Sequence, residues 1–234
     1  MLFAYAERLL QMRDESLLAV ADHGANPRGT ITVGANEATC LYVLPDVFAK
    51  YCSLYPGVQV SIYRNFSYKI LEKLENGSID VGIVTLPVKS ASVKVHPIFR
   101  DQLMWMVHPQ SGLAKQDSVS LPEIAKQPIL LPKTGYTRRL MDKLLRPFKA
   151  ELQVPMELPS VGMIKSFVAA GLGVSLISVS FARDQVLAGR VKLIPPREKE
   201  LWRELAIAYR RDRTMTRATA TFIGTVRQLA AASK

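Results

Sequence analysis

Apolar and polar positions follow a repeated order along this chain, in which short alternating runs are followed by longer runs with helical spacing. Residues 30–33 alternate as a β-strand does, and Gly34 ends the run. Apolar residues then recur three or four apart, at Leu41, Leu44, Phe48, Tyr51 and Tyr55. Because proline suits only the first turn of a helix, Pro45 predicts a helix that begins near Leu41, after a polar loop.

The same order is repeated directly afterwards. Residues 58–62 alternate as a second strand, Ser67 is a candidate cap for a second helix, and residues 79–85 form a third apolar run. Strands that alternate with helices predict a parallel sheet with right-handed crossovers.

A second unit follows from residue 103. Residues 120–123, Ser-Leu-Pro-Glu, are typical of a helix start, with a serine cap and an acid three positions later. The remaining predicted strands are 103–107, 129–131, 174–177, 191–194 and 205–209. The remaining predicted helices are 160–170, 216–232 and one that follows the loop 132–137 and holds Leu140, Leu144 and Phe148.

The first 22 residues have helical spacing of a different kind. Phe3, Leu10 and Leu17 are seven residues apart, which favours pairing with another helix. Residues 23–29, HGANPRG, are then a linker. We therefore predict self-association through this helix.

Polar residues gather where predicted strands end and helices begin. Open α/β sheets bind ligands at the carboxyl ends of their strands, and helix N-termini favour small anions. The first such junction holds Asn36, Glu37 and Thr39, the second Asn65 and Ser67, and the third Thr134, Gly135, Tyr136 and Thr137. The alternative at each junction is that these residues only cap the following helix.

Two arginines follow the third junction. Arg138 and Arg139 lie in the opening turns of a predicted helix, where positive charge opposes the helix dipole. Anion binding would offset that cost, and solvent-exposed arginines screened by salt are the alternative.

Composition and charge exclude several classes of protein. Apolar residues make up 48% of the 234 residues, so the chain can bury a full core. The net charge of +11 suggests a nucleic-acid partner, but the basic residues are dispersed and no recognition helix is found, which favours a solvated basic face.

No run of residues is long and apolar enough to predict a membrane span or a signal peptide, so we expect a cytoplasmic protein. Cys40 and Cys52, placed on one predicted helix, are interpreted as small core residues in a reduced compartment.

No pattern indicates an enzyme. His23, His96 and His108 are scattered, and the chain has no nucleophile elbow, no His-Glu-x-x-His motif and no phosphate-binding loop. No cofactor or metal site is expected.

Together, the order and spacing of these segments resemble the effector-binding region of LysR-type transcriptional regulators. The resemblance covers nearly the whole chain and is carried by FAYAERLLQMRDESL, GTITVGANEATCLYVLPDVFAKYCSLYPGVQVSI, SYKILEKLENGSIDVGIV, MIKSFVAAGLGVSLIS and LAIAYRRDRTMTRATATFIGTVRQL. It implies an α/β fold with two Rossmann-like subdomains of the type II periplasmic-binding-protein kind, joined by two crossing strands, with a ligand cleft between them. The implied boundaries are 1–28 for the linker helix and linker, 29–102 plus 206–234 for subdomain I, and 103–205 for subdomain II.

The resemblance also implies which residues contact the effector. They are Asn36, Glu37, Ala38, Thr39, Asn65, Ser67, Thr85, Thr134, Gly135, Tyr136, Thr137, Ser160 and Val161, to which the helix-dipole argument adds Arg138. Many members of the family have serine or threonine where Ala38 stands, and Glu37 adds a negative charge. A polar or mixed-charge effector is therefore expected as readily as a simple carboxylate.

The expected partners follow from the same resemblance. They are a small-molecule effector, a second copy of the chain in a homodimer or homotetramer, and DNA, which would be bound only through an N-terminal helix-turn-helix domain that this sequence lacks. The alternative function is a solute-binding protein of the same fold that serves transport.

Overall fold

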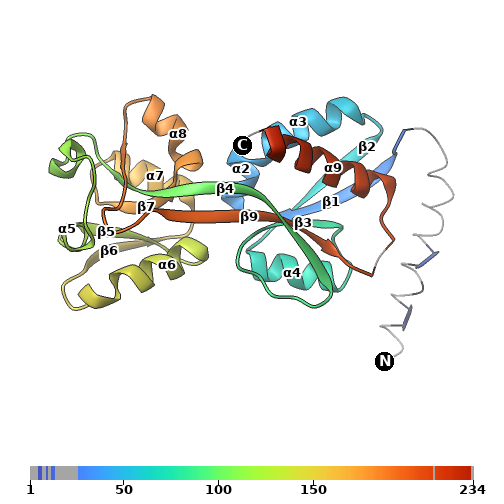
Figure 1. Ribbon diagram of the computed structural model, residues 1–234, viewed down its shortest axis with the longest axis horizontal. Helices are drawn as coiled ribbons and strands as arrows, with labels where there is room; N and C mark the ends of the chain where they lie inside the picture. Colours follow the sequence, from blue (N-terminus) through green and yellow to red (C-terminus); the bar gives the residue numbers. More distant parts are fainter. Residues whose placement is uncertain (1–4, 7–8, 10–11, 14–25, 213, 233–234) are drawn as a thin grey trace. The chain divides into compact units, whose positions relative to one another are not determined.

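A computed structural model describes residues 5–6, 9, 12–13, 26–212 and 214–232 (Figure 1). The predicted helix over residues 1–22 and its seven-residue spacing lie largely outside these residues, so self-association through it stays a prediction. The chain divides into two compact units, residues 1–98 with 206–234 (unit 1) and residues 99–205 (unit 2). None of the described helices is long and apolar enough to span a membrane.

Unit 1 is built on a sheet with the strand order β2-β1-β3-β9-β4. β1 (Gly29–Ala35) pairs in parallel with β2 (Val58–Arg64) and with β3 (Val81–Thr85). The two longest strands, β4 (Val93–Val107) and β9 (Leu201–Arg210), contribute residues to both units (Figure 1). Since β1, β2 and β3 run in the same direction, their carboxyl ends lie on one edge.

Helices cover both faces of this sheet (Figure 1). α3 (Leu44–Leu54) and α9 (Arg217–Ala232) pack together on one face, where the ring centroids of Phe222 and Tyr51 are 5.2 Å apart. α4 (Ser67–Glu75) covers the other face with Ile70 and Leu74, both fully buried. Its close approach requires Gly82, where an added Cβ would lie 2.6 Å from the side chain of Ile70.

The first helix differs from the prediction. Instead of a polar loop and one helix from Leu41, the structure has α2 (Glu37–Tyr42) and α3, separated at Val43. Asn36 caps α2 because its side chain accepts a hydrogen bond from the backbone N–H of Thr39 at 2.9 Å. Pro45 lies at the second position of α3, and since its ring clashes with a continuous helix, the prediction of one helix was wrong.

Unit 2 has two sets of strands. β4 pairs antiparallel with β7 (Ser175–Ser178) and β8 (Lys192–Ile194), whereas β5 (Pro128–Pro132) pairs in parallel with β6 (Gln153–Leu158). A parallel bridge between Ile129 and Val174 links β5 to the segment before β7. The carboxyl ends of β5, β6 and β7 therefore lie on one edge.

The helices of unit 2 are η1 (Gly112–Lys115), α5 (Leu121–Ala125), α6 (Tyr136–Leu145), η2 (Arg146–Phe148), α7 (Val161–Ala169) and α8 (Val179–Leu187). Three of them, η1, α5 and α6, contribute side chains to a core that includes Trp105, which is fully buried. The predicted start of α5 is confirmed, because the N–H and hydroxyl of Ser120 donate to Glu123 at 2.8 and 2.6 Å. The sequence did not predict β6 or α8.

Candidate functional site

In unit 1, the structure brings the predicted site residues of all three parallel strands to one edge of the sheet. The N–H of Asn65, after β2, donates to the carbonyl oxygen of Ala35 at the end of β1, at 3.1 Å. The N–H of Thr85, at the end of β3, donates to the hydroxyl oxygen of Ser67 at 3.1 Å. Strand-end residues that are far apart in sequence are therefore tied together by direct hydrogen bonds.

Ser67 is not the cap that the sequence predicted. The N-cap of α4 is Phe66, and Ser67 is the first helical residue, with its hydroxyl turned to Thr85. Among the residues that the structure describes, no acceptor is found for the backbone N–H groups of Ser67 and Tyr68. The start of this nine-residue helix therefore presents donors at the strand-end edge.

The first junction contributes fewer accessible groups than expected. Thr39 is 0% exposed, and its hydroxyl oxygen is buried without a hydrogen-bond partner in the described part of the chain. Ala38 is also buried. The partly exposed residues of this junction are Asn36, the N-cap of α2, and Glu37, its first residue.

Arg64, in the second junction, was not among the predicted effector contacts. Its guanidinium lies 3.8 Å from the carboxylate of Glu37, with 67% of the Arg64 side chain and 34% of the Glu37 side chain exposed. An exposed pair of this kind contributes little to stability but leaves a cation beside the strand ends. The negative charge of Glu37, which argued against an anionic effector, is therefore partly neutralised.

Two aromatic rings at the start of α4 were likewise not among the predicted effector contacts. The rings of Phe66 and Tyr68 lie 6.4 Å apart and nearly parallel, and both side chains are exposed. The ammonium of Lys69 is 5.9 Å from the Tyr68 ring. A ligand at this edge thus meets apolar ring faces as well as polar donors.

In unit 2, the predicted residues follow the carboxyl ends of β5 and β6. The N–H of Lys133 donates to the carbonyl oxygen of Leu158 at 2.8 Å, which joins the two strand ends. Ser160 is the N-cap of α7 and accepts a hydrogen bond from the N–H of Met163 at 3.2 Å, with Val161 as the first helical residue. Thr134 is exposed beside them.

The third junction is shorter than predicted, because α6 begins at Tyr136. Gly135 is its N-cap with φ 99° and ψ −170°, a conformation that is essentially restricted to glycine. Tyr136 and Thr137 are therefore helical, and the hydroxyl of Tyr136 donates to the carbonyl oxygen of Trp202 on β9 at 3.1 Å.

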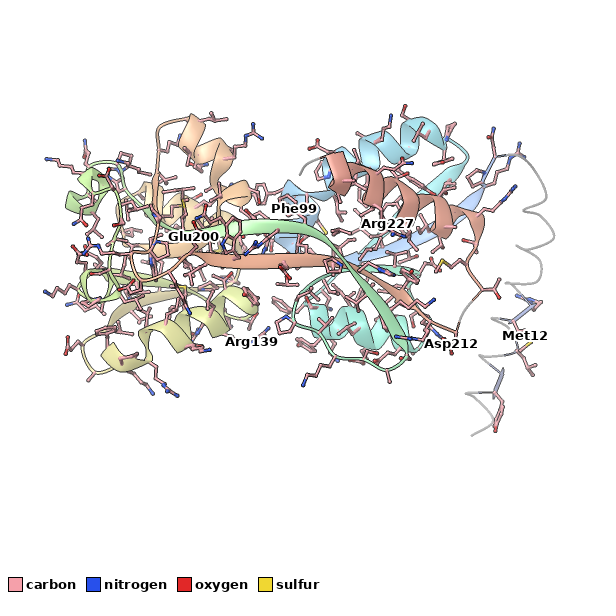
Figure 2. All side chains as sticks on the ribbon, viewed as in Figure 1. Met12, Phe99, Arg139, Glu200, Asp212 and Arg227 are labelled. Atoms are coloured by element: carbon pink, nitrogen blue, oxygen red, sulfur yellow. The ribbon has the colours of Figure 1, made fainter. Side chains whose placement is uncertain are left out.

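Arg138 is held by the protein itself. Its Nε donates to the two carboxylate oxygens of Asp142 at 2.9 and 3.0 Å, and a terminal nitrogen lies 2.7 Å from the carboxylate of Glu157. These acids offset the unfavourable helix dipole, so the position of Arg138 is explained without anion binding. Its neighbour Arg139 is exposed on α6 (Figure 2).

The sequence did not predict a buried cluster in unit 2 formed by Arg203, Asp101 and Phe181. Arg203 on β9 is 4% exposed, and one terminal nitrogen lies 3.5 Å from the carboxylate of Asp101 on β4. Its guanidinium carbon lies 4.2 Å from the centroid of the Phe181 ring on α8. Burial lowers the pKa of Arg203 to about 10, against the opposing effect of Asp101, so Arg203 stays positively charged at neutral pH.

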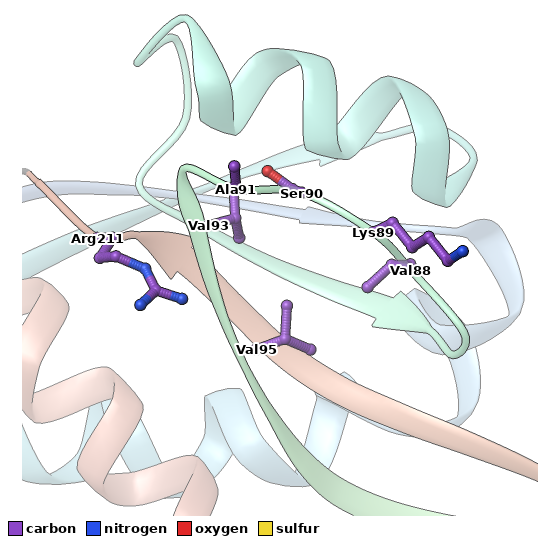
Figure 3. A pocket seen from close by; sticks show the side chains of 7 residues that line it. All are labelled: Val88, Lys89, Ser90, Ala91, Val93, Val95 and Arg211. Atoms are coloured by element: carbon purple, nitrogen blue, oxygen red, sulfur yellow. The ribbon is translucent and has the colours of Figure 1, made fainter.

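A surface pocket of about 710 Å³ lies elsewhere on unit 1. Figure 3 shows its lining, which comes from the segment after β3, the start of β4 and the residue that follows β9. Its lining residues are Val88, Lys89, Ser90, Ala91, Val93, Val95 and Arg211. No residue of the predicted effector site lines it.

Neither a cluster of metal ligands nor a disulfide is found among the described residues. No group of three or more histidine, cysteine or acidic side chains there could hold a metal ion. Cys40 lies on α2 and Cys52 on α3, and both are free. Because Cys52 is exposed, its interpretation as a small core residue was wrong.

Comparison with known families decides the class of the protein. The family model described as LysR substrate binding domain matches residues 24–231. The chain belongs to this family. It is thus the effector-binding region of a LysR-type transcriptional regulator, as the resemblance implied.

Relatives of this LysR domain are transcriptional regulators. The chain is 25% identical over 230 residues to a probable RuBisCO transcriptional regulator of Synechocystis sp., covering 95% of this chain and 67% of that protein. It is 28% identical over 196 residues to the HTH-type transcriptional regulator YeiE of Escherichia coli, covering 83% of this chain and 67% of that protein. These relatives favour a regulator over a transport protein.

Solved structures show the same fold. The Synechocystis CcmR regulatory domain in complex with 2-PG superposes with a TM-score of 0.78 at 19% identity, covering 87% of this chain and 98% of that chain. The effector-binding domain of QuiR in complex with shikimate superposes with a TM-score of 0.75 at 17% identity, covering 88% and 98% of the two chains. At these identities the likeness supports the fold.

Proposed function

We propose that this LysR domain binds a small polar or anionic metabolite at the carboxyl ends of its parallel strands. The observation that carries the proposal is the hydrogen-bonded edge of unit 1, where Asn65 is tied to Ala35 and Ser67 to Thr85. This edge holds polar side chains and unpaired helix donors in fixed positions, which lowers the ordering cost of binding. Open α/β sheets commonly bind ligands at such an edge.

The groups at this edge favour an oxygen-rich ligand. Asn36 presents its amide nitrogen, since its oxygen caps α2, and Arg64 presents a cation. The amide of Asn65 donates to the hydroxyl of Tyr63 and accepts from the N–H of Phe66, which fixes its position at this edge. The N–H groups at the start of α4 are further donors. A carboxylate or hydroxyl group can accept hydrogen bonds from these donors. The adjoining Phe66 and Tyr68 rings favour a compound with a planar or apolar body.

Regulation is proposed to follow from this binding. An effector shifts a conformational equilibrium only as far as it binds one state more tightly than the other. The output is proposed to be DNA binding by a helix-turn-helix segment of the kind named in the relatives, with the domain acting as a homodimer or homotetramer.

We also propose that residues of unit 2 contact the effector, because they follow the carboxyl ends of β5 and β6. They are Thr134, Gly135, Thr137, Ser160 and Val161.

Thermal unfolding tests the proposal. We expect a panel of small organic acids, including shikimate and 2-PG, to contain a compound that raises Tm, since a ligand at 100 times its Kd stabilises the folded state by about 2.7 kcal/mol. Asn65→Ala and Arg64→Ala should reduce that shift. Ser61→Ala, at an exposed position of β2, is the control and should leave it unchanged. A panel without any stabilising compound would contradict the proposal.

A further inference from the structure

Arg203 has more hydrogen-bond donors than its surroundings satisfy. The guanidinium is almost fully buried, and the 3.5 Å contact with Asp101 is its one polar contact within the described part of the chain. Its Nε is buried without a partner there. Buried polar groups are normally hydrogen-bonded, and a buried cation is costly unless it is well paired. The surroundings of Arg203 therefore leave part of its hydrogen-bonding capacity unused.

Asp101 balances the charge of Arg203 but pairs with only one of its N–H groups, because it also accepts hydrogen bonds from α8. The N–H of Ser180 donates to one oxygen of Asp101 at 3.3 Å, and the hydroxyl of Ser180 donates to the other at 2.5 Å. The carboxylate therefore lies at the N-terminus of α8, where the helix dipole stabilises negative charge. Arg203 shares this acid with the helix instead of having a counterion of its own.

The Phe181 ring fixes the plane of the guanidinium without using its donors. The 4.2 Å separation is that of a cation–π contact. An arginine held in this way keeps its planar fork of N–H groups oriented, and this fork matches the two oxygens of a carboxylate or phosphate.

The cluster lies on the edge of unit 2 that carries the predicted effector residues. Ser178 ends β7 and pairs with Leu103, two residues after Asp101 on β4. Its hydroxyl is also buried without a partner in the described part of the chain. The hydroxyl of Tyr136, at the start of α6, donates a hydrogen bond to the carbonyl oxygen of Trp202, the residue before Arg203. Two unpaired buried polar groups thus lie beside the strand ends.

We infer that Arg203 selects effectors that carry a carboxylate or phosphate group, by pairing that oxyanion with the donors that the chain leaves free. The inference rests on the proposed function and deepens it, because it names the ligand group and the residue that recognises it. Arg203 differs in this respect from Arg138, the arginine that the sequence suggested, because Nε and one terminal nitrogen of Arg138 are paired with Asp142 and Glu157.

A direct test uses the side-chain Nε–H signals of arginine in NMR spectra of the whole ¹⁵N-labelled chain. The Arg203 signal is assigned by its loss in Arg203→Lys. We expect acetate and inorganic phosphate to shift it saturably, whereas acetamide, which has the shape of acetate without its charge, leaves it in place. The signal of the exposed Arg190 is the control for general ionic effects. An Arg203 signal that does not move with either anion, or that moves equally with acetamide, overturns the inference.

Variants supply the second test. Because Arg203→Gln alone leaves Asp101 buried without its cation, it is paired with Asp101→Asn in a double variant. We expect this double variant to bind acetate and phosphate about tenfold more weakly or worse, as loss of a charge-assisted hydrogen bond requires. Arg190→Gln should bind them as the wild type does. Equal affinities in the double variant and the wild type would contradict the inference.

The two proposals fail in different ways. If an acid from the metabolite panel stabilises the wild type and the double variant equally, the role of Arg203 is refuted and the proposed function stands. If no member of the panel stabilises the wild type, the proposed function is refuted, and the Arg203 signal still decides whether this residue binds oxyanions.

Discussion

The hydroxyl of Ser67 accepts a hydrogen bond from the backbone N–H of Thr85, and this contact joins residues 18 positions apart. It holds the first turn of α4 against the end of β3. The same serine therefore has a structural partner and lies at the proposed ligand edge, so its substitution should change both stability and binding.

Ser67→Ala is expected to lower the free energy of unfolding by about 0.5–1.5 kcal/mol, because the Thr85 N–H loses its acceptor. Urea denaturation measures this loss. Ser61→Ala on the exposed face of β2 is the matched control and should cost less than about 0.5 kcal/mol. Equal effects of the two substitutions would show that the Ser67 contact is not stabilising.

Asn36→Ala should destabilise the protein by about 0.5–2 kcal/mol, the usual cost of removing an N-cap side chain. The reason is that the Thr39 N–H then loses its acceptor at 2.9 Å. Asn36→Ser keeps a capping oxygen and should recover most of the stability in the same denaturation experiment. If serine were as destabilising as alanine, capping would not be the role of this residue.

Gly135→Ala should cost about 1–3 kcal/mol, since its positive φ of 99° is unfavourable for any side chain. The cost comes from the backbone, because an added Cβ at Gly135 meets no atom within 4 Å. Gly112→Ala is the matched control, with equal free space and no positive φ, and should be nearly neutral. Calorimetric melting of both variants compares them, and similar Tm values would contradict the conformational argument.

Glu123 should make stability depend on pH in the acidic range. The hydroxyl of Ser120, and after it the backbone N–H of Ser120, lowers the pKa of Glu123 from 4.5 to about 2. A carboxylate whose pKa is lower in the folded state stabilises it fully above the unfolded pKa, and this contribution is lost as pH falls from about 4.5 to about 2. Unfolding free energies of wild type and Glu123→Gln, measured across this range, should converge toward pH 2. A difference that stays constant would contradict the assignment.

The two thiols should differ in reactivity. Cys52 is exposed, whereas burial raises the pKa of the half-buried Cys40 and so reduces its thiolate fraction. We expect Cys52 to react faster with a thiol-specific reagent at pH 8, as followed by peptide mass spectrometry. In Cys52→Ser the fast phase should disappear, and a fast phase that persists would mean that Cys40 is the reactive thiol.

Alternation and helical spacing were sufficient to predict β1, β2, α4 and α9 and the α/β class, because these signals depend on local burial. The capping residues Ser120 and Glu123 predicted α5. Alternation and helical spacing did not predict the break at Val43. Asn36 caps the short helix α2 before this residue, and Pro45 lies in the first turn of α3 after it. The same patterns also missed β6, because five of its six residues are exposed or half-buried and give no apolar run. Local patterns therefore located the strand-helix junctions, and errors arose where capping or exposure opposed them.

The sequence by itself determined the family, the parallel strand-helix order and the places where ligand-type residues gather, because each depends on the order of residues along the chain. Only the tertiary structure decided which of those residues are accessible. Thr39 is buried and Arg138 is held by two acids, while Arg203, Asp101 and Phe181, from three separate elements, meet in one cluster. Such a cluster has no signature in sequence, since packing between distant strands and helices creates it.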